Sequence, residues 1–257
     1  MLKKGDLVTI IHNRTGKKWV RELVGKFYTQ YGEINLEECI GKEEGVVITS
    51  KSGEKFSVFK SLQSEYILKM RRKAQIIYPK DSAHIVFDAR IPGEKNFVFE
   101  MGCGSGGLTI PLANVLHEKD FLITVDKRKE FLERCKKNLE RYVNQKNNVA
   151  FVIADAENLP FKDNIFNIMC LDLLNPWDYV NELERISRKG ATFFFYLTNV
   201  TQILELYKTI KDRNFTDLKI FEIMQREWKI SDKIARPKER MVGHTGFIVR
   251  ARRYYEM

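Results

Sequence analysis

The fold is decided by one stretch, which reads Phe97-Val98-Phe99-Glu100-Met101-Gly102-Cys103-Gly104-Ser105-Gly106-Gly107-Leu108-Thr109. An apolar strand ends here, glycines allow a tight turn and the close approach of a ligand, and a helix begins. This unit predicts a ligand site at the carboxyl end of the strand. The glycine spacing alone is only moderately specific, so the acidic residues around it must narrow the choice of ligand.

Three successive strands of the pattern end in a carboxylate. Glu100 precedes the glycines and would meet a dinucleotide pyrophosphate poorly, whereas it would favour the ammonium of a methionine moiety. Asp126 lies 24 residues after Gly102 and suits a carboxylate that accepts both ribose hydroxyls. Asp155, followed by Ala156, is placed to hold an adenine amino group. The alternatives, a nicotinamide-binding domain or a plain α/β turn, explain these features less well together.

The combination therefore predicts a class I S-adenosylmethionine-dependent methyltransferase. The residues expected to hold S-adenosylmethionine are Glu100, Gly102, Cys103, Gly104, Ser105, Gly106, Gly107, Leu108, Asp126, Asp155, Ala156 and Asp172.

The rest of the chain from about residue 82 alternates between buried strands and amphipathic helices. Strands are expected at 96–100, 121–126, 149–153, 165–171 and 191–197, with a last pair near 218–226 and 245–252, and helices at 108–116, 129–144 and 201–213. Continuous apolar strands separated by helices predict a doubly wound, Rossmann-like α/β sheet.

The front of the chain has a different pattern. Residues 1–60 contain short β-branched strands punctuated by glycine, which predict a small barrel-like β domain. A connecting helix is expected over 61–73, and the Tyr78-Pro79 pair should break it. We therefore predict an N-terminal β domain at 1–65 and a methyltransferase domain at 66–257, with the boundary in the interval 60–75.

Composition limits the classes of function. The 257 residues carry a net charge of +10, of which +7 lies in residues 1–80. Basic excess suits a polyanion such as RNA, although ordinary solubility charge explains it about equally well. The longest apolar runs, such as 193–197, are strand-sized, so no membrane span and no signal peptide are expected. Four scattered cysteines and four scattered histidines predict neither a metal site nor disulfides, and the protein is expected to be cytoplasmic.

The fourth strand ends in Asp172, shortly before Pro176-Trp177. An aspartate there is placed to accept a hydrogen bond from a base amino group and to face a developing positive charge. The alternative is a helix N-cap. Tyr78 and Tyr196 lie just outside the expected sheet, where each could stack on a base or brace it, or simply pack with a satisfied hydroxyl.

Several segments together resemble a known family. They are residues 75–81, 100–108, 171–172 with 176–177, 236–237 and 241–247, in this order. These segments are similar to those of the tRNA (adenine-N1) methyltransferases that modify the T-loop adenine at position 58, and in some archaea also at position 57. The likeness covers nearly the whole chain, and the segments 78–81 and 243–246 are more specific than the glycine loop.

The resemblance implies the following roles. S-adenosylmethionine is the methyl donor, tRNA is the acceptor, and the enzyme is a homotetramer. Asp172 is the main catalytic group, with Tyr78 and Tyr196 near the target base and His244 in the Gly-His-Thr segment. If RNA is the acceptor, the charge pattern predicts that the basic residues 1–80, with Arg71, Arg72 and Lys73 among them, hold its phosphates.

The chain departs from the family pattern at three places. Leu174 stands where a proline is common, and Asp126 stands where a glutamate is usual. Residues 155–161 are more typical of quinone-type methyltransferases. A small-molecule methyltransferase for a quinone or corrin precursor is therefore the alternative function. A third alternative, a non-catalytic RNA-binding subunit, is disfavoured because the glycine loop and Asp172 are retained.

Overall fold

A computed structural model describes residues 1–91, 95–143 and 148–256. The chain forms two compact units, Met1–Met70 and Arg71–Met257. The boundary expected from sequence, between residues 65 and 66, falls inside the helix α1 (Gln63–Lys69), which belongs to the first unit.

The first unit is built from short strands. Its elements are β1 (Leu7–His12), β2 (Lys18–Glu22), β3 (Lys26–Thr29), β4 (Gly32–Asn35), the 3₁₀ helix η1 (Leu36–Cys39), β5 (Val46–Thr49), β6 (Lys55–Lys60) and α1. One sheet has the order β2-β1-β6-β5 with antiparallel pairing, and β3 pairs with β4 in a hairpin. Val8, Ile10, Phe56 and Val58 lie at every second position of β1 and β6 and form part of the core of this unit.

The second unit is a sheet flanked by helices. Its elements are α2 (Pro79–Asp88), β7 (Phe97–Met101), α3 (Thr109–Val115), β8 (Phe121–Asp126), α4 (Lys129–Tyr142), β9 (Val149–Ile153), β10 (Phe166–Leu171), η2 (Pro176–Tyr179), α5 (Val180–Ile186), β11 (Ser187–Leu197), α6 (Val200–Ile210), β12 (Phe215–Phe221), β13 (Trp228–Ser231), β14 (Ile234–Pro237) and β15 (Phe247–Arg253).

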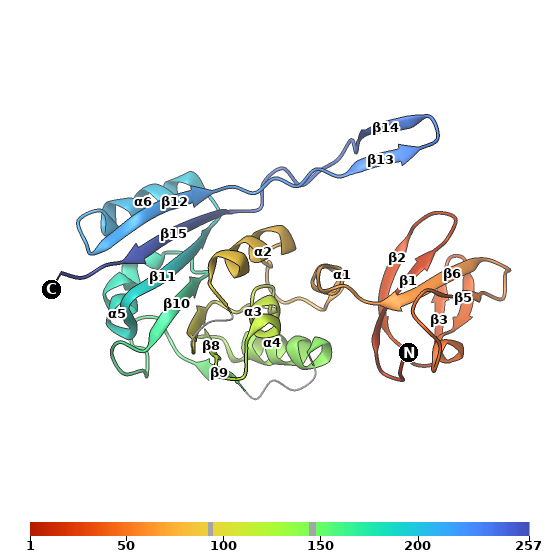
Figure 1. The fold of residues 1–257 in the computed structure, drawn as a ribbon, viewed down its shortest axis with the longest axis horizontal. Helices are drawn as coiled ribbons and strands as arrows, with labels where there is room; N and C mark the ends of the chain where they lie inside the picture. Colours follow the sequence, from red (N-terminus) through yellow and green to blue (C-terminus); the bar gives the residue numbers. More distant parts are fainter. Residues whose placement is uncertain (92–94, 144–147, 257) are drawn as a thin grey trace. The chain divides into compact units, whose positions relative to one another are not determined.

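The main sheet has the strand order β12-β15-β11-β10-β7-β8-β9 (Figure 1). The five strands from β11 to β9 run parallel, and β15 lies antiparallel between β11 and β12. This confirms the α/β, Rossmann-like fold expected from sequence. Because β10, β7 and β8 are neighbours and parallel, the residues that follow them meet at one edge of the sheet.

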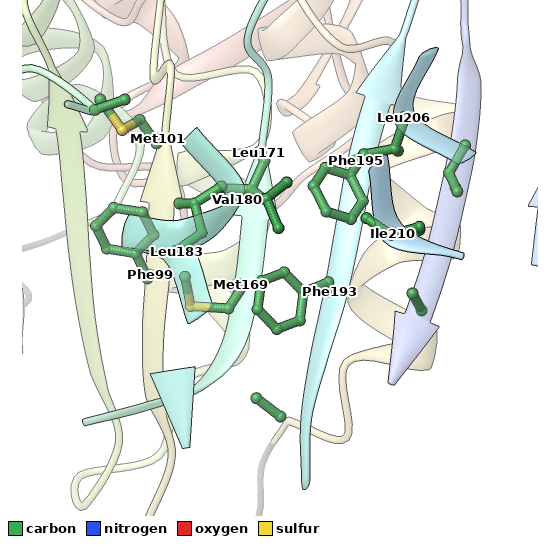
Figure 2. Close-up of a cluster of buried hydrophobic side chains, with 14 of the residues drawn as sticks. Phe99, Met101, Met169, Leu171, Val180, Leu183, Phe193, Phe195, Leu206 and Ile210 are labelled. Atoms are coloured by element: carbon green, nitrogen blue, oxygen red, sulfur yellow. The ribbon is translucent and has the colours of Figure 1, made fainter. Parts of the chain in front are cut away.

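One face of this sheet is packed by α5 and α6 (Figure 2). Alternate residues of β7, β10 and β11 point to that face, and helix residues cover them; the labelled members are Phe99, Met101, Met169, Leu171, Phe193, Phe195, Val180, Leu183, Leu206 and Ile210. Each of these side chains is at most 3 % exposed. Such close packing makes the strand ends a rigid base for a site.

Several elements were not expected from the sequence. Pro79 starts α2, because proline is well accommodated in the first turn of a helix and fixes the backbone angle that the helix needs. α5 and the β13–β14 hairpin were also missed, and α1 ends at Lys69, earlier than expected. None of the helices in the described residues is long and apolar enough to cross a membrane.

The packed face gives a prediction about stability. Phe193→Ala should lower the free energy of unfolding by about 3–5 kcal/mol, because it removes buried apolar surface and leaves a cavity. Phe87→Ala is the matched control: Phe87 is 86 % exposed, and its loss should change stability by less than about 0.5 kcal/mol. Denaturant unfolding of both variants tests this. Equal effects would contradict the assignment of Phe193 to the core.

Candidate active site at the carboxyl edge of the sheet

The glycine loop is locked against the end of β10. Gly102 has a φ of +88°, and a Cβ atom there would lie 2.1 Å from the carbonyl oxygen of Asp172. The Asp172 amide donates a hydrogen bond to the Met101 carbonyl at 2.9 Å. Any side chain at 102 would therefore push the two strand ends apart. This backbone contact fixes Asp172 beside the loop.

Residues 71–77 pack on the outside of the same loop. A Cβ at Gly107 would lie 3.0 Å from both the Ile76 Cβ and the Ile77 carbonyl oxygen. The Ser105 Oγ accepts a hydrogen bond from the Lys73 amide at 2.9 Å. Asn138 of α4 donates from its Nδ2 to the carbonyls of Ser105 and Arg71, both at 2.9 Å. The loop is thus held from both sides, and Ser105 is occupied in this packing.

A cavity of about 340 Å³ opens at this edge of the sheet. The residues that line it come from the ends of β7, β8, β9 and β10 and from η2; they are Met101, Gly102, Asp126, Lys127, Arg128, Asp155, Ala156, Asp172, Leu173, Leu174, Asn175 and Tyr179. Gly102, Asp126, Asp155, Ala156 and Asp172 were expected from the sequence. The structure brings these five together around one space.

The other lining residues were missed. Lys127 and Arg128 follow Asp126 directly, so their position after a strand was a usable signal. Tyr179 lies in η2, which the sequence did not predict. Leu174 is 78 % exposed at the cavity.

Glu100 lies beneath the glycine loop rather than in the cavity lining. It is 2 % exposed, and its Oε2 accepts hydrogen bonds from the hydroxyls of Thr109 at 2.7 Å and Thr124 at 2.6 Å. Burial, reinforced by the charge of Asp126, raises the pKa of Glu100 to about 7, although both threonine bonds oppose the rise. Burial therefore disfavours the ionised form of Glu100, and a cation placed above it would favour that form.

Asp126 is held at the end of β8 by short-range contacts. Its Oδ1 accepts from the Arg128 amide at 3.0 Å and from Arg128 Nε at 3.3 Å, and its Oδ2 accepts from the Gly104 amide at 3.4 Å. Asp155 is half-exposed at the end of β9, with Lys127 Nζ 3.8 Å away. Both carboxylates keep oxygen lone pairs that a ligand hydroxyl or amino group can use.

Asp172, which lines the cavity, has a strongly raised pKa. Burial, together with the negative charges of Glu100 and Asp126, raises the pKa of Asp172 to about 7, and Arg128 lowers it only in part. A cation placed in the cavity would relieve this repulsion and favour the ionised carboxylate.

The site therefore fits a cationic ligand that also carries ribose and adenine. S-adenosylmethionine has these parts, with a positively charged sulfur and an ammonium group. No group of three acidic, histidine or cysteine residues suited to a metal ion occurs in the part of the chain that the structure describes.

The remaining residues expected from sequence lie outside the cavity lining. Gly104, Gly106 and Gly107 shape the loop, while Cys103 and Leu108 are buried with side chains 4 % exposed. Arg71, Arg72 and Lys73 are exposed. Tyr78 is partly buried at the N-cap of α2.

Tyr196 and His244 also lie outside the cavity lining, and each has its own hydrogen-bond partners. Tyr196 is 6 % exposed and donates its hydroxyl to Asp81 Oδ2 at 3.2 Å, so it braces neighbouring residues. The His244 Nδ1 faces Glu222 Oε1 at 2.6 Å, and its Nε2 faces the Thr198 carbonyl at 2.9 Å. Because both partners are acceptors, they favour the doubly protonated ring, and the pKa of His244 is raised, chiefly by Glu222.

Comparison with known proteins identifies the family. The family described as the tRNA methyltransferase complex GCD14 subunit matches residues 64–233. The chain belongs to this family. This confirms the resemblance to the T-loop adenine methyltransferases that was inferred from the sequence.

Two curated relatives match this chain over most of their length. A protein of Thermus thermophilus named tRNA (adenine(58)-N(1))-methyltransferase TrmI is 32 % identical, over 90 % of this chain and 89 % of the relative. A Methanocaldococcus jannaschii protein named for adenines 57 and 58 is 30 % identical, over 95 % and 94 %.

Two solved structures have the same architecture. The tRNA (m1A58) methyltransferase TrmI of Aquifex aeolicus is 31 % identical, with a TM-score of 0.87 and 99 % of each chain covered. A Thermotoga maritima structure described as a SAM-dependent O-methyltransferase is 26 % identical, with a TM-score of 0.91 and 100 % and 96 % covered.

The buried acids give a prediction about pH. Glu100 and Asp172 have pKa values raised to about 7, so the ligand-free folded protein holds more protons than the unfolded chain between about pH 4 and 7. Their contribution to stability is therefore present at low pH and is lost as pH rises through about 7.

Glu100→Gln provides the test, because it removes one titrating group. The loss of its charge also reduces the rise in the pKa of Asp172, which changes the relative stability in the same direction. The stability of this variant relative to the natural protein should increase as pH is raised from 5 to about 7.5, measured by denaturant unfolding. A relative stability that falls over this range would contradict the raised pKa of Glu100.

Proposed function

We propose that this protein is an S-adenosylmethionine-dependent methyltransferase that modifies N1 of the T-loop adenine of tRNA. The target is position 58, either alone or together with position 57. The observation that carries the proposal is Asp172, a carboxylate of raised pKa locked beside the glycine loop on a cavity with Asp126 and Asp155. The full-length likeness to proteins named for this reaction supports it.

The donor is held by residues at three strand ends. S-adenosylmethionine supplies the methyl group on a positively charged sulfur. Asp126 accepts from the ribose hydroxyls, and Asp155 with Ala156 meets the adenine. Gly102 and its neighbours allow the methionine end to approach the backbone, and Glu100 adds negative charge beneath it.

Asp172 acts on the acceptor. The lone pair of adenine N1 is itself the nucleophile, so catalysis needs alignment more than a strong base. Methylation makes the adenine cationic, and Asp172, accepting a hydrogen bond from the N6 amino group, stabilises that charge more in the transition state than before it. The target base is stacked in folded tRNA and must be extruded to reach this position.

Basic residues are proposed to hold the RNA. Residues 1–80 carry a net charge of +7, and Arg71, Arg72 and Lys73 directly precede the segment that covers the glycine loop. Phosphate contacts at 71–73 would therefore place the RNA backbone near the methyl-transfer site.

We also propose a cytoplasmic homotetramer. The β13–β14 hairpin pairs only with itself among the described residues and reaches away from the main sheet (Figure 1). Trp228 and Ile230 on it are 61 % and 81 % exposed. An isolated two-stranded hairpin with exposed apolar side chains is marginally stable in water, so association with other copies would stabilise it.

The small-molecule alternative is less well supported. The curated relatives named here that match about nine-tenths of the chain carry tRNA methyltransferase names, whereas the curated quinone methyltransferases match 27 % and 37 % of it. The first unit and the basic residues 71–73 would also have no role in a small-molecule enzyme.

The catalytic proposal predicts a large effect at Asp172. Asp172→Ala should lower the single-turnover rate of tRNA methylation at saturating donor by on the order of 10²–10³-fold, the scale of one preorganised electrostatic partner. Asp126→Ala should instead weaken donor binding by roughly 1–3 kcal/mol, measured by calorimetry.

Asp178→Ala is the matched control, since Asp178 is an exposed carboxylate of η2 outside the cavity lining. It should methylate at the natural rate. If Asp172→Ala also methylates at the natural rate, the proposed mechanism is wrong.

The RNA proposal predicts salt dependence. The affinity for tRNA should fall steeply with rising salt, because each neutralised phosphate releases counterions. Changing Arg71, Arg72 and Lys73 to Glu should weaken tRNA binding and leave donor binding unchanged. Changing Lys129, Lys136 and Lys137 of α4 to Glu gives the same change in net charge and serves as the control. Equal losses in the two triple variants would show that total charge, and not the 71–73 segment, governs binding.

A further inference from the structure

A closed ring of hydrogen bonds joins two of the family-like segments, 78–81 and 243–246. Lys80 Nζ donates to Asp81 Oδ1 at 2.7 Å and to Thr245 Oγ1 at 2.5 Å, and Thr245 Oγ1 donates to Asp81 Oδ2 at 2.6 Å. The Asp81 side chain is fully buried, and that of Lys80 is only 10 % exposed. The ring therefore ties the start of α2 to the loop that leads into β15.

Tyr196 at the end of β11 is attached to the same ring. Its hydroxyl donates to Asp81 Oδ2 at 3.2 Å. Gly246 packs flat against the tyrosine, because a Cβ there would lie 2.5 Å from the Tyr196 Cζ atom. Burial and the charge of Asp81 raise the pKa of Tyr196, so the hydroxyl remains protonated and remains a donor.

Burial of the Lys80–Asp81 ion pair is unfavourable by itself, and the pair lies outside the cavity that we assign to the methyl donor, the donor cavity. Taking two charges out of water costs several kcal/mol per ion, which the attraction between them repays only in good geometry. Neither Lys80 nor Asp81 lines the donor cavity. The ring is, however, joined to Tyr78, because the Asp81 amide donates to the Tyr78 carbonyl at 2.9 Å. Tyr196 and Asp172 follow the paired residues Phe195 and Leu171 of the neighbouring strands β11 and β10. The ring thus lies beside the strand end that carries Asp172.

We propose that Lys80, Asp81 and Thr245 are positioning residues for the acceptor: their hydrogen-bonded ring fixes Tyr78 and Tyr196 relative to Asp172, so that the adenine is aligned for attack. The proposal rests on the proposed function, since it concerns that enzyme's acceptor base. Loss of the ring should lower the rate of the chemical step and leave donor binding unchanged.

Thr245 offers the sharpest test, because two variants differ only in the ring. Thr245→Val keeps the shape of the side chain but removes the hydroxyl, whereas Thr245→Ser keeps the hydroxyl. At saturating tRNA and donor, Thr245→Val should lower the single-turnover methylation rate roughly 10–100-fold, because small misplacements of a reacting group are costly. Thr245→Ser should restore most of the rate, and the donor dissociation constant should be unchanged in both.

Asp120→Asn controls for a purely structural effect. Asp120 is also fully buried and accepts hydrogen bonds from the Asn96 amide and side chain, but it lies at the amino end of β8, opposite the site. This change should lower the melting temperature without lowering the single-turnover rate of the folded protein. If Thr245→Val does not fold, Asp81→Asn is judged by the same criteria.

The outcomes separate the two proposals. If the natural protein methylates tRNA and the Thr245→Val variant does so at the same rate, the positioning role is wrong, even if the variant has a lower melting temperature. The proposed function then still stands. A natural protein that binds donor but transfers no methyl group to tRNA overturns the proposed function and the positioning role with it.

Discussion

The burial of carboxylates at one edge of a parallel sheet, reinforced by the repulsion among them, is the constraint on which the site depends. Glu100, Asp126 and Asp172 end the neighbouring strands β7, β8 and β10, and Arg128 offsets only part of their charge. The packed face of the sheet prevents the strands from separating, and Gly102 lets the end of β10 come within backbone contact of the loop. A cationic donor relieves the repulsion, so the fold is arranged for a ligand of that charge.

Much of this was predictable because it depends on local sequence. The strand–glycine loop–helix unit and the acidic strand ends are read directly from residue order, and the parallel sheet then brings Asp126, Asp155 and Asp172 to one cavity. The buried position of Glu100 under two threonine hydroxyls was not predictable, because Thr109 and Thr124 come from α3 and β8 and meet it only in the fold. Tyr179 was missed for a similar reason, whereas Arg128 could have been expected from its place directly after the end of β8.

The roles of Tyr196 and His244 could not be deduced from residue type alone. Tyr196 was expected either to stack on a base or brace it, or to pack with a satisfied hydroxyl. Its burial against Gly246 and its bond to Asp81 are those of a packed tyrosine, and a role toward the base stays a prediction. His244 faces two acceptors, which favours a cationic ring holding Glu222 and Thr198 together. Tyr196 contacts Asp81, 115 positions away, and His244 contacts Thr198 and Glu222, 46 and 22 positions away. Sequence spacing does not reveal these contacts.

The most direct test of the account is mass spectrometry of nucleosides from an unmodified tRNA transcript incubated with the protein and isotopically labelled S-adenosylmethionine, with the modified position mapped by nuclease digestion. The account predicts labelled 1-methyladenosine in the T-loop, at position 58 or at 57 and 58. Label found in another nucleoside, or absent from RNA although the protein binds the donor, would contradict it.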